Sequence, residues 1–171
     1  MKKYILLAFF ISFNFLTTAQ KVNWTSFEKA IELNKINPRP ILIDIYTDWC
    51  GWCKKMDKET YSNKTIVDYI NTYYYAVKLD GEGKDPIVYK NHTFKFKQQG
   101  RSKYHEFPAT LMNGKLSYPT TVILNEKEEL IDKIPGYLKP KMMEKLLIYF
   151  HTKKYETEKW TDFEKNFKSN L

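Results

Sequence analysis

The sequence predicts an α/β fold in which a central mixed β-sheet is flanked by helices. A strand-like apolar run, 41–46, is followed by a charged helical stretch and a second β-rich run, 73–79. This order is typical of two parallel strands joined by a right-handed crossover. Two later apolar runs, 120–124 and 130–134, flank a short charged connector and predict an antiparallel hairpin. Parallel and antiparallel pairs together make a mixed sheet.

The chain begins with a segment that resembles a targeting signal. Two lysines precede an apolar run from Tyr4 to Leu16, and small residues follow up to Ala19. This order is typical of a secretory signal peptide, and the run is shorter than the ~20 residues that a membrane-spanning helix needs. We expect residues 1–19 to be a signal peptide cleaved near Ala19. The protein is then periplasmic or secreted, with no stable membrane anchor after cleavage.

The rest of the chain is expected to fold as one domain. Residues 20–150 suit a single hydrophobic core, and residues 151–171 are expected to form a C-terminal helical extension. Without Lys2 and Lys3 the chain has 26 basic and 20 acidic residues, a net charge of +6 that is spread along the sequence. A nucleic-acid surface would show clustered Arg and Lys, so we expect no nucleic-acid partner.

Each expected helix is recognised by its start and its apolar face. Thr25 and Glu28 have the spacing of a capping box for the first helix, which ends before Pro38. The second helix follows the cysteines, with Met56 on its buried side and Asp57 on its solvated side. The expected helices are 26–34, 51–61, 66–70, 104–112 and 140–150, with an additional one that starts near Trp160.

Segment 81–100 interrupts this regular alternation. Its glycines and Pro86 predict an inserted loop, and the alternating phenylalanines between 93 and 97 predict a short strand or hairpin within it. Near the C-terminus, Thr161 and Glu164 repeat the capping-box spacing and predict the start of the last helix.

Cys50 and Cys53 are the only cysteines, and they lie between the first strand and the next helix. At a helix N-terminus, backbone N–H groups favour the thiolate, which is the attacking species, so Cys50 is a candidate nucleophile. Cys53, one turn further in, is positioned to resolve a mixed disulfide. Asp44 lies on the apolar strand and is the candidate acceptor of the Cys53 proton, since burial raises a carboxyl pKa. A solvent-facing Asp44 is the alternative.

The residues around the cysteine pair do not match the usual zinc or haem sites. Zinc usually takes four ligands, and the three histidines are scattered through the chain. Covalent haem attachment needs a histidine after the second cysteine, where Lys54 stands. We expect neither a metal nor another cofactor. A copper(I) ion between two thiolates and an inert structural disulfide stay open as alternatives.

These residues together resemble the thioredoxin superfamily, over roughly residues 24–150. The resemblance rests on Asp44, Trp49-Cys50-Gly51-Trp52-Cys53-Lys54, Lys78-Leu79-Asp80, Tyr118-Pro119-Thr120 and Gly136. Exported thioredoxin-like proteins and the C-terminal domain of the transmembrane thiol:disulfide reductase are the most similar branches. The resemblance implies a thioredoxin fold with an insertion before a cis-proline, Pro119, and an extra C-terminal helix. It also implies that Cys50 is the nucleophile, Cys53 the resolving cysteine and Asp44 the buried proton acceptor.

The resemblance further implies supporting residues and a function. Lys78 is the expected neighbour of Asp44, and Gly136 is a supporting residue. The candidate substrate-binding residues are Trp49, Gly51, Trp52 and Tyr118. Trp52 and Tyr118 differ from the residues of thioredoxin itself. The implied activity is thiol–disulfide exchange with protein substrates, as a reductant supplied by an upstream electron donor. The alternative is a non-catalytic thioredoxin-like binding module or copper(I) carrier.

Overall fold

The structure is a computed structural model that describes residues 20–169 and 171. The signal peptide expected at residues 1–19 lies outside the described residues, so export stays a prediction. Within the described part of the chain, no helix has the length and apolar character to cross a membrane.

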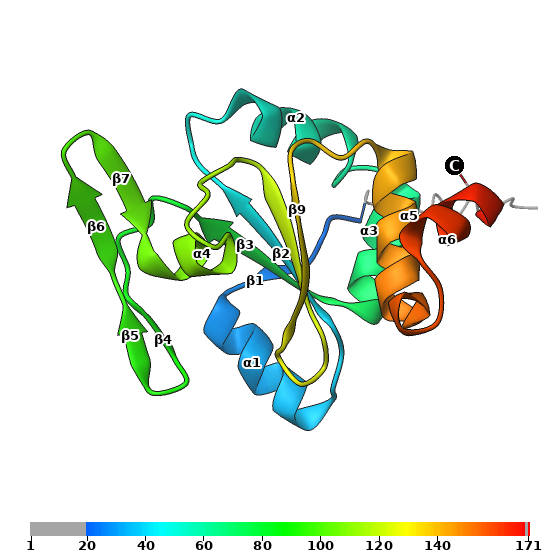
Figure 1. Ribbon diagram of the computed structural model, residues 1–171, viewed down its shortest axis with the longest axis horizontal. Coiled ribbons are helices and arrows are strands. Elements are labelled where there is room, and N and C mark those ends of the chain that lie inside the picture. Colours follow the sequence, from blue (N-terminus) through cyan, green and yellow to red (C-terminus); the bar gives the residue numbers. More distant parts are fainter. Residues whose placement is uncertain (1–19, 170) are drawn as a thin grey trace, which may run out of the picture.

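A five-stranded mixed sheet forms the centre of the fold (Figure 1). Its strands are β1 (Trp24–Thr25), β2 (Ile41–Tyr46), β3 (Tyr75–Asp80), β8 (Thr120–Leu124) and β9 (Leu130–Pro135). They lie in the order β1-β3-β2-β8-β9. The pairs β1·β3 and β2·β3 are parallel, whereas β2·β8 and β8·β9 are antiparallel. The predicted crossover pair and hairpin are confirmed, and the two-residue edge strand β1 is an addition to them.

Helices cover both faces of this sheet (Figure 1). They are α1 (Phe27–Ile36), α2 (Gly51–Glu59), α3 (Lys64–Tyr73), α4 (Glu106–Leu111), α5 (Pro140–His151) and α6 (Trp160–Asn166), with a 3₁₀ turn at Lys154–Glu156. Buried side chains of α1 and α4 pack in one core cluster, and those of α2, α3, α5 and α6 pack in the other. The structure is a thioredoxin fold, and α6 is the extra C-terminal helix that the sequence predicts.

Strand β2 is the central strand between these two cores. Ile41, Ile43 and Ile45 contribute to the core beneath α1 and α4, while Leu42 belongs to the core beneath α2, α3 and α5. Because side chains alternate along a strand, Asp44 shares the face of Leu42. It is only 1% exposed. The alternation therefore carries the carboxyl group into the interior, on the side that α2 covers.

Two predicted helix caps are wrong. Ser26, not Thr25, caps α1, and its hydroxyl accepts from the Lys29 backbone N–H at 3.2 Å. Ser26 itself still has extended backbone, with φ −70° and ψ 159°, so the helix starts at Phe27 and its cap lies one residue later than predicted. Helix α6 begins after Lys159, and no side chain among residues 20–169 and 171 caps it, so Thr161 lies inside the helix rather than before it.

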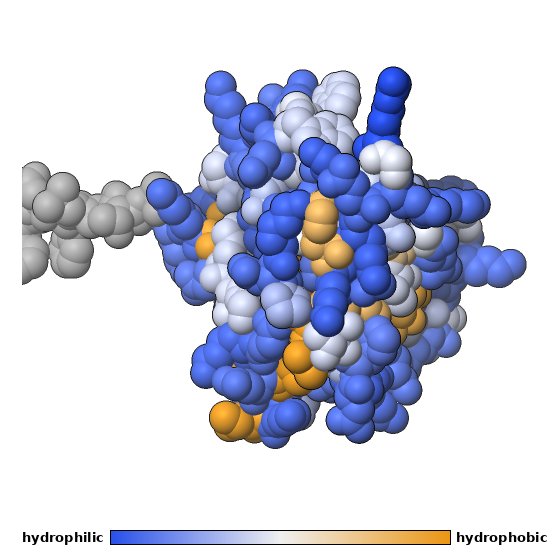
Figure 2. All heavy atoms as spheres, turned by 90° about the vertical axis from the view of Figure 1, so that its left-hand side faces the viewer, coloured by the Kyte–Doolittle hydropathy of each residue, from blue (hydrophilic) through white to orange (hydrophobic). Residues whose placement is uncertain are grey.

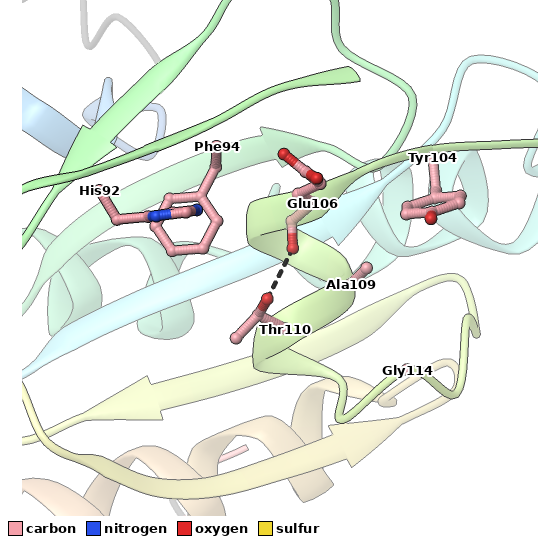
Figure 3. A pocket seen from close by; sticks show the side chains of 7 residues that line it. All are labelled: His92, Phe94, Tyr104, Glu106, Ala109, Thr110 and Gly114. Atoms are coloured by element: carbon pink, nitrogen blue, oxygen red, sulfur yellow. Dashed lines mark hydrogen bonds between the residues drawn. The ribbon is translucent and has the colours of Figure 1, made fainter. Parts of the chain in front are cut away.

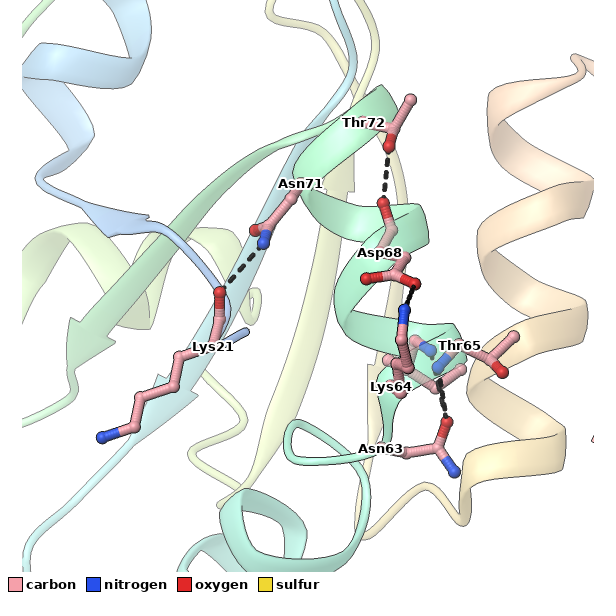
Figure 4. A network of polar contacts seen from close by, with 8 residues as sticks. Lys21, Asn63, Lys64, Thr65, Asp68, Asn71 and Thr72 are labelled. Carbon is pink, nitrogen blue, oxygen red and sulfur yellow. Dashed lines mark hydrogen bonds and ion pairs between the residues drawn. The ribbon is translucent and has the colours of Figure 1, made fainter. Parts of the chain in front are cut away.

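Helix α3 is longer than expected and is anchored by polar contacts (Figure 4). The Asn63 side chain caps it, accepting from the backbone N–H groups of the next turn at 3.0 and 3.3 Å. Lys64 pairs with Asp68 one turn later. Near the other end, Asn71 donates to the Lys21 carbonyl at 2.9 Å, which ties the start of the described chain to this helix.

The insertion forms two hairpins rather than one. They are β4 (Ile87–Tyr89) with β5 (His92–Phe94), and β6 (Phe96–Gln99) with β7 (Ser102–His105). They project from one side of the molecule, at the left in Figure 1. The insertion therefore extends past its expected end at Gly100. The next helix, α4, starts at Glu106, and Pro108 lies in its first turn, where the missing N–H breaks no helical hydrogen bond.

Candidate active site

The two cysteines lie where the chain turns from β2 into α2. Cys50 is the N-cap of α2, and its backbone N–H donates to the Thr47 carbonyl at 3.1 Å. Its Sγ accepts from the Cys53 backbone N–H, also at 3.1 Å. A disulfide joins Cys50 to Cys53, with their Cα atoms 5.3 Å apart. A backbone donor aimed at Sγ favours the thiolate once the disulfide is reduced.

Both sulfurs are largely covered. Cys53 is 2% exposed, as its place one turn into the helix predicts, but Cys50 is only 4% exposed. The flanking tryptophans are far more open, with Trp49 65% and Trp52 59% exposed. Gly51, the first residue of α2, has open space where a side chain would stand. The two indole rings are therefore far more accessible to a second molecule than the sulfur of Cys50 is.

Aromatic rings extend the site on both sides of the disulfide. Trp49 makes an edge-to-face contact with Tyr118, with ring centroids 5.7 Å apart, and its indole N–H donates to the Glu82 carboxylate at 3.1 Å. Trp52 lies against Tyr137, with centroids 5.6 Å apart. These contacts hold in place two tryptophans that are otherwise exposed.

A hollow of about 290 Å³ lies beside Trp52. It is lined by Trp52, Tyr118, Pro119, Gly136 and Tyr137. The Tyr118–Pro119 peptide bond is cis. Gly136 has a φ of +97°, a backbone conformation that favours glycine, and its N–H donates to the Pro119 carbonyl at 2.7 Å. Four residues predicted from the sequence therefore meet in one hollow, although Trp52 is far from the others in the chain.

Asp44 is the buried member of an ionic cluster on the α2 side of the sheet. Lys78, its neighbour on β3, approaches Asp44 Oδ2 to 3.4 Å and also pairs with Asp57 of α2. Asp57 stands one helical turn after Cys53, so both residues share the helix face that looks onto the sheet. Asp57, Lys78 and Asp44 thus form a chain of ion pairs on the α2 side of the sheet.

The Lys78 ammonium is also enclosed by aromatic rings. Its Nζ lies 5.2, 5.1 and 5.8 Å from the ring centroids of Trp24, Tyr46 and Tyr61. Cation–π contacts of this kind stabilise a charge that has lost part of its water. They keep the lysine beside Asp44.

The protonation of Asp44 is set mainly by burial. Loss of hydration raises its pKa from 3.8 to about 6, the Lys78 charge opposes that shift, and the Asp57 charge adds to it. Asp44 Oδ1 is buried and has no hydrogen-bond partner among the described residues. The carboxylate is therefore able to accept a proton near neutral pH.

Sequence reasoning missed several residues of this site. Asp57 was expected on the solvated side of its helix, but it pairs with Lys78 and its side chain is only 43% exposed. The four-residue spacing from Cys53 was the available signal. Glu82 and Tyr137 meet the tryptophans only through tertiary contacts, and their local sequence carries no signal for that.

Gly81 is required by the position of the Tyr118 ring. A Cβ atom at Gly81 would lie 2.4 Å from Tyr118 Cε1. We expect Gly81→Ala to displace this ring from Trp49 and to lower the free energy of unfolding by about 1–3 kcal/mol, the usual cost of overpacking. Urea denaturation followed by tryptophan fluorescence measures both effects. Gly51→Ala is the matched control, because no atom in the described part of the chain lies within 4 Å of the position its Cβ would take. Equal stability of the two variants would refute the prediction.

A second hollow of about 290 Å³ lies between the β4–β5 hairpin, β7 and α4 (Figure 3). His92, Phe94 and Tyr104 contribute rings to it, and Thr110 donates to the Glu106 carbonyl at 2.8 Å. It contains neither cysteine. Across residues 20–169 and 171, no group of three or more His, Cys, Asp and Glu side chains is arranged to hold a metal ion.

Comparison with known families gives a match over most of the chain. A family described as "Thioredoxin-like domain" matches residues 27–151.

Two curated relatives are thiol:disulfide interchange proteins DsbD. That of Pseudoalteromonas atlantica is 27% identical over 71 residues, covering 41% of this chain and 12% of the relative. That of Pectobacterium atrosepticum is 28% identical over 58 residues, covering 32% of this chain and 10% of the relative. The chain thus spans about a tenth of the length of these relatives.

Solved structures share the fold at low sequence identity. A structure described as "DsbH Oxidoreductase" has a TM-score of 0.54 at 16% identity, with 90% of this chain and 95% of that chain covered. A putative disulphide-isomerase from Bacteroides thetaiotaomicron has a TM-score of 0.55 at 21% identity, covering 83% and 99%. A thioredoxin from Thermus thermophilus has 0.56 at 12%, covering 89% and 100%.

Proposed function

Because this chain belongs to the thioredoxin-like domain family and carries a Cys50–Cys53 disulfide at the start of α2, we propose that it reduces disulfide bonds in protein substrates. The fold, the family and the spacing of the cysteines support thiol–disulfide oxidoreductase activity. The single observation that carries the proposal is the Cys53 backbone N–H that points at Cys50 Sγ, since it stabilises the attacking thiolate.

In the first step, the Cys50 thiolate of the reduced enzyme attacks one sulfur of a substrate disulfide. A mixed disulfide between Cys50 and the substrate forms, and the other substrate sulfur leaves as a thiolate that takes a proton from solvent. The hollow beside Trp52, lined by Tyr118 and Pro119, receives the chain next to the attacked sulfur. Exposed indole rings suit a polypeptide substrate, because they offer apolar contact area at the rim.

In the second step, Cys53 attacks Cys50 Sγ and releases the reduced substrate. Cys53 must first lose its proton, and Asp44 accepts it, directly or through water. Asp44 is suited to this role because its pKa of about 6 leaves it mostly ionised at neutral pH yet basic enough to accept a proton. Lys78 pairs with the Asp44 carboxylate and lowers its pKa, while the Asp57 charge raises that pKa. The disulfide closes with two electrons passed to the substrate, and an upstream dithiol donor restores the reduced pair.

The cellular location, the domain boundaries and the reducing direction are parts of the same proposal. We propose a periplasmic or secreted protein, with residues 1–19 as a cleaved signal peptide, 20–150 as the thioredoxin-like domain and 151–171 as the C-terminal extension. The reducing direction is proposed by analogy with the thiol:disulfide interchange proteins that match part of the chain.

The activity is tested by insulin reduction with dithiothreitol. We expect the wild type to precipitate insulin B chain well before dithiothreitol alone does. A rate no faster than dithiothreitol alone would sink the enzyme proposal. That result would favour a non-catalytic thioredoxin-like binding module. Copper(I) titration against a competing chelator would then test whether the protein is a copper(I) carrier.

The direction of electron flow is tested by the reduction potential of the Cys50/Cys53 pair. We expect a value nearer to the −270 mV or so of thioredoxin than to the −120 mV or so of the strong oxidant DsbA. Equilibration in glutathione buffers, followed by alkylation and mass spectrometry, gives this value. A potential near that of DsbA would reverse the proposed direction without affecting the exchange chemistry.

A further inference from the structure

The β4–β7 insertion carries a concentration of positive charge. We define the basic arm as residues 84–105, which include both hairpins. Its basic residues are Lys84, Lys90, Lys95, Lys97, Arg101 and Lys103, and all six are exposed. Asp85 is the only acidic residue within these limits. The arm therefore has a strongly positive surface, although the charge of the chain as a whole is spread out.

Most of this charge is not neutralised by the rest of the fold. Lys97 pairs with Glu106 at 3.3 Å, and Lys84 lies over the Phe96 ring. Lys95, Arg101 and Lys103 form no ion pair with any residue in the described part of the chain. Exposed cations without partners are available to an acidic ligand.

The arm is attached directly to the aromatic rim of the candidate active site. At its base, the Gly81 carbonyl accepts from the His105 N–H at 2.7 Å, and Gly81 packs against the Tyr118 ring. The next residue, Glu82, accepts from the Trp49 indole. The arm thus begins at the two rings, Trp49 and Tyr118, that flank the disulfide.

The arm is also packed onto the body of the domain rather than detached from it. Phe94 contacts Phe107 of α4, with ring centroids 5.1 Å apart, and His105 is 1% exposed. Figure 2 looks onto this side of the molecule and shows hydrophilic side chains over most of it. The basic arm is therefore a supported, charged extension of the rim.

We propose that the basic arm docks an acidic segment of the protein substrate while the neighbouring disulfide of that substrate reaches Cys50. This proposal rests on the proposed function. A protein partner fits better than a nucleic acid, because the arm has one arginine to five lysines. Its phenylalanine and tyrosine rings are all partly buried, whereas base stacking needs exposed rings.

The first test uses two synthetic peptides with the same internal disulfide, one flanked by glutamates and one by serines. At about 0.01 M NaCl we expect the wild type to reduce the acidic peptide with a kcat/KM about tenfold higher. At about 0.15 M NaCl the preference should shrink, because the Debye length falls from about 30 Å to about 8 Å.

The second test removes the unpaired charges. The triple variant Lys95→Gln, Arg101→Gln, Lys103→Gln should lose the preference and keep the wild-type rate on the neutral peptide. The matched control, Lys159→Gln, Lys165→Gln, Lys168→Gln, removes the same charge near α6, at the opposite end of the molecule from the arm (Figure 1). It should keep the preference. If circular dichroism shows that the triple variant is unfolded, Arg101→Gln alone should give a partial loss.

Other outcomes separate the docking proposal from the enzyme proposal. Reduction of both peptides at equal rates by the wild type would overturn docking and leave the oxidoreductase intact. An equal loss of the preference for the acidic peptide in the two triple variants would also overturn the docking proposal. The net charge of the protein, and not the basic arm, would then cause the preference. Tight binding of a DNA oligonucleotide that the arm variant abolishes, without a peptide preference, would assign the surface to nucleic acid. Reduction of neither peptide would refute both proposals.

Discussion

Replacement of Cys50 by serine is expected to remove almost all enzyme-dependent insulin reduction. The part of the rate that exceeds dithiothreitol alone should fall by about three orders of magnitude. A serine hydroxyl is a far weaker nucleophile than a thiolate, and the backbone N–H of Cys53 has then no thiolate to stabilise. The turbidity assay measures this loss directly. Because Cys50 is 4% exposed, serine should fit the same space, and thermal melts of the reduced proteins serve as the control for folding.

Cys53→Ser separates the two steps of the proposed reaction. The first attack by Cys50 should proceed, but the mixed disulfide should persist because the resolving thiol is missing. Non-reducing electrophoresis and mass spectrometry detect this adduct. The double variant Cys50→Ser, Cys53→Ser is the control and should trap nothing. An adduct on Cys53 in the Cys50→Ser variant, formed as readily, would contradict the assignment of Cys50 as nucleophile.

Asp44→Asn is expected to slow the resolving step by about ten- to a hundredfold, at the low end of general-base effects. In the wild type this rate should rise as pH increases through about 6, because Asp44 ionises there and becomes able to take the proton. The asparagine variant should lack that rise. Single-turnover kinetics across this pH range measures it. An unchanged pH profile in the variant would remove Asp44 from the mechanism.

The same substitution should make the protein more stable at neutral pH. Burial raises the Asp44 pKa from 3.8 to about 6, so the folded chain binds more protons than the unfolded chain between these values. Stability therefore falls as pH rises through this window, and the full cost is present above it. Asparagine carries no charge and avoids this cost. We expect a gain of about 3 kcal/mol at neutral pH and almost none below about pH 4.

Asp68→Asn provides a matched control for this stability gain. Asp68 lies on α3, and its ion-pair partner among the described residues is Lys64, whose side chain is 85% exposed. Exposed pairs of this kind contribute about 0–1 kcal/mol, so the control should show a small change of the opposite sign. Urea denaturation at several pH values compares the two variants. A loss of stability in Asp44→Asn at neutral pH would contradict the burial argument.

The cysteine pair and the strand before it could be predicted from the sequence, because the patterns that identify them span only a few neighbouring residues. Cys50 and Cys53 are separated by one helical turn, and Asp44 is found by counting along an apolar strand. The burial of Asp44 was left open by the sequence, and the structure decides it by covering β2 on both faces. Helix caps were predicted less well, because α1 starts one residue later than the Thr25 spacing predicts and α6 starts before Thr161.

By itself, then, the sequence determined the thioredoxin fold, the disulfide-forming cysteine pair and the helices and strands recognised by their periodicity. Only the tertiary structure decided which residues from distant parts of the chain lie beside the cysteines and Asp44. It brought Asp57 to Lys78, set Gly81 against Tyr118 and built the basic arm from two hairpins beside Trp49. The physical reason is range: helix and strand periodicity act between near neighbours in the chain, whereas ion pairs, ring contacts and charged surfaces form between segments that only folding brings together.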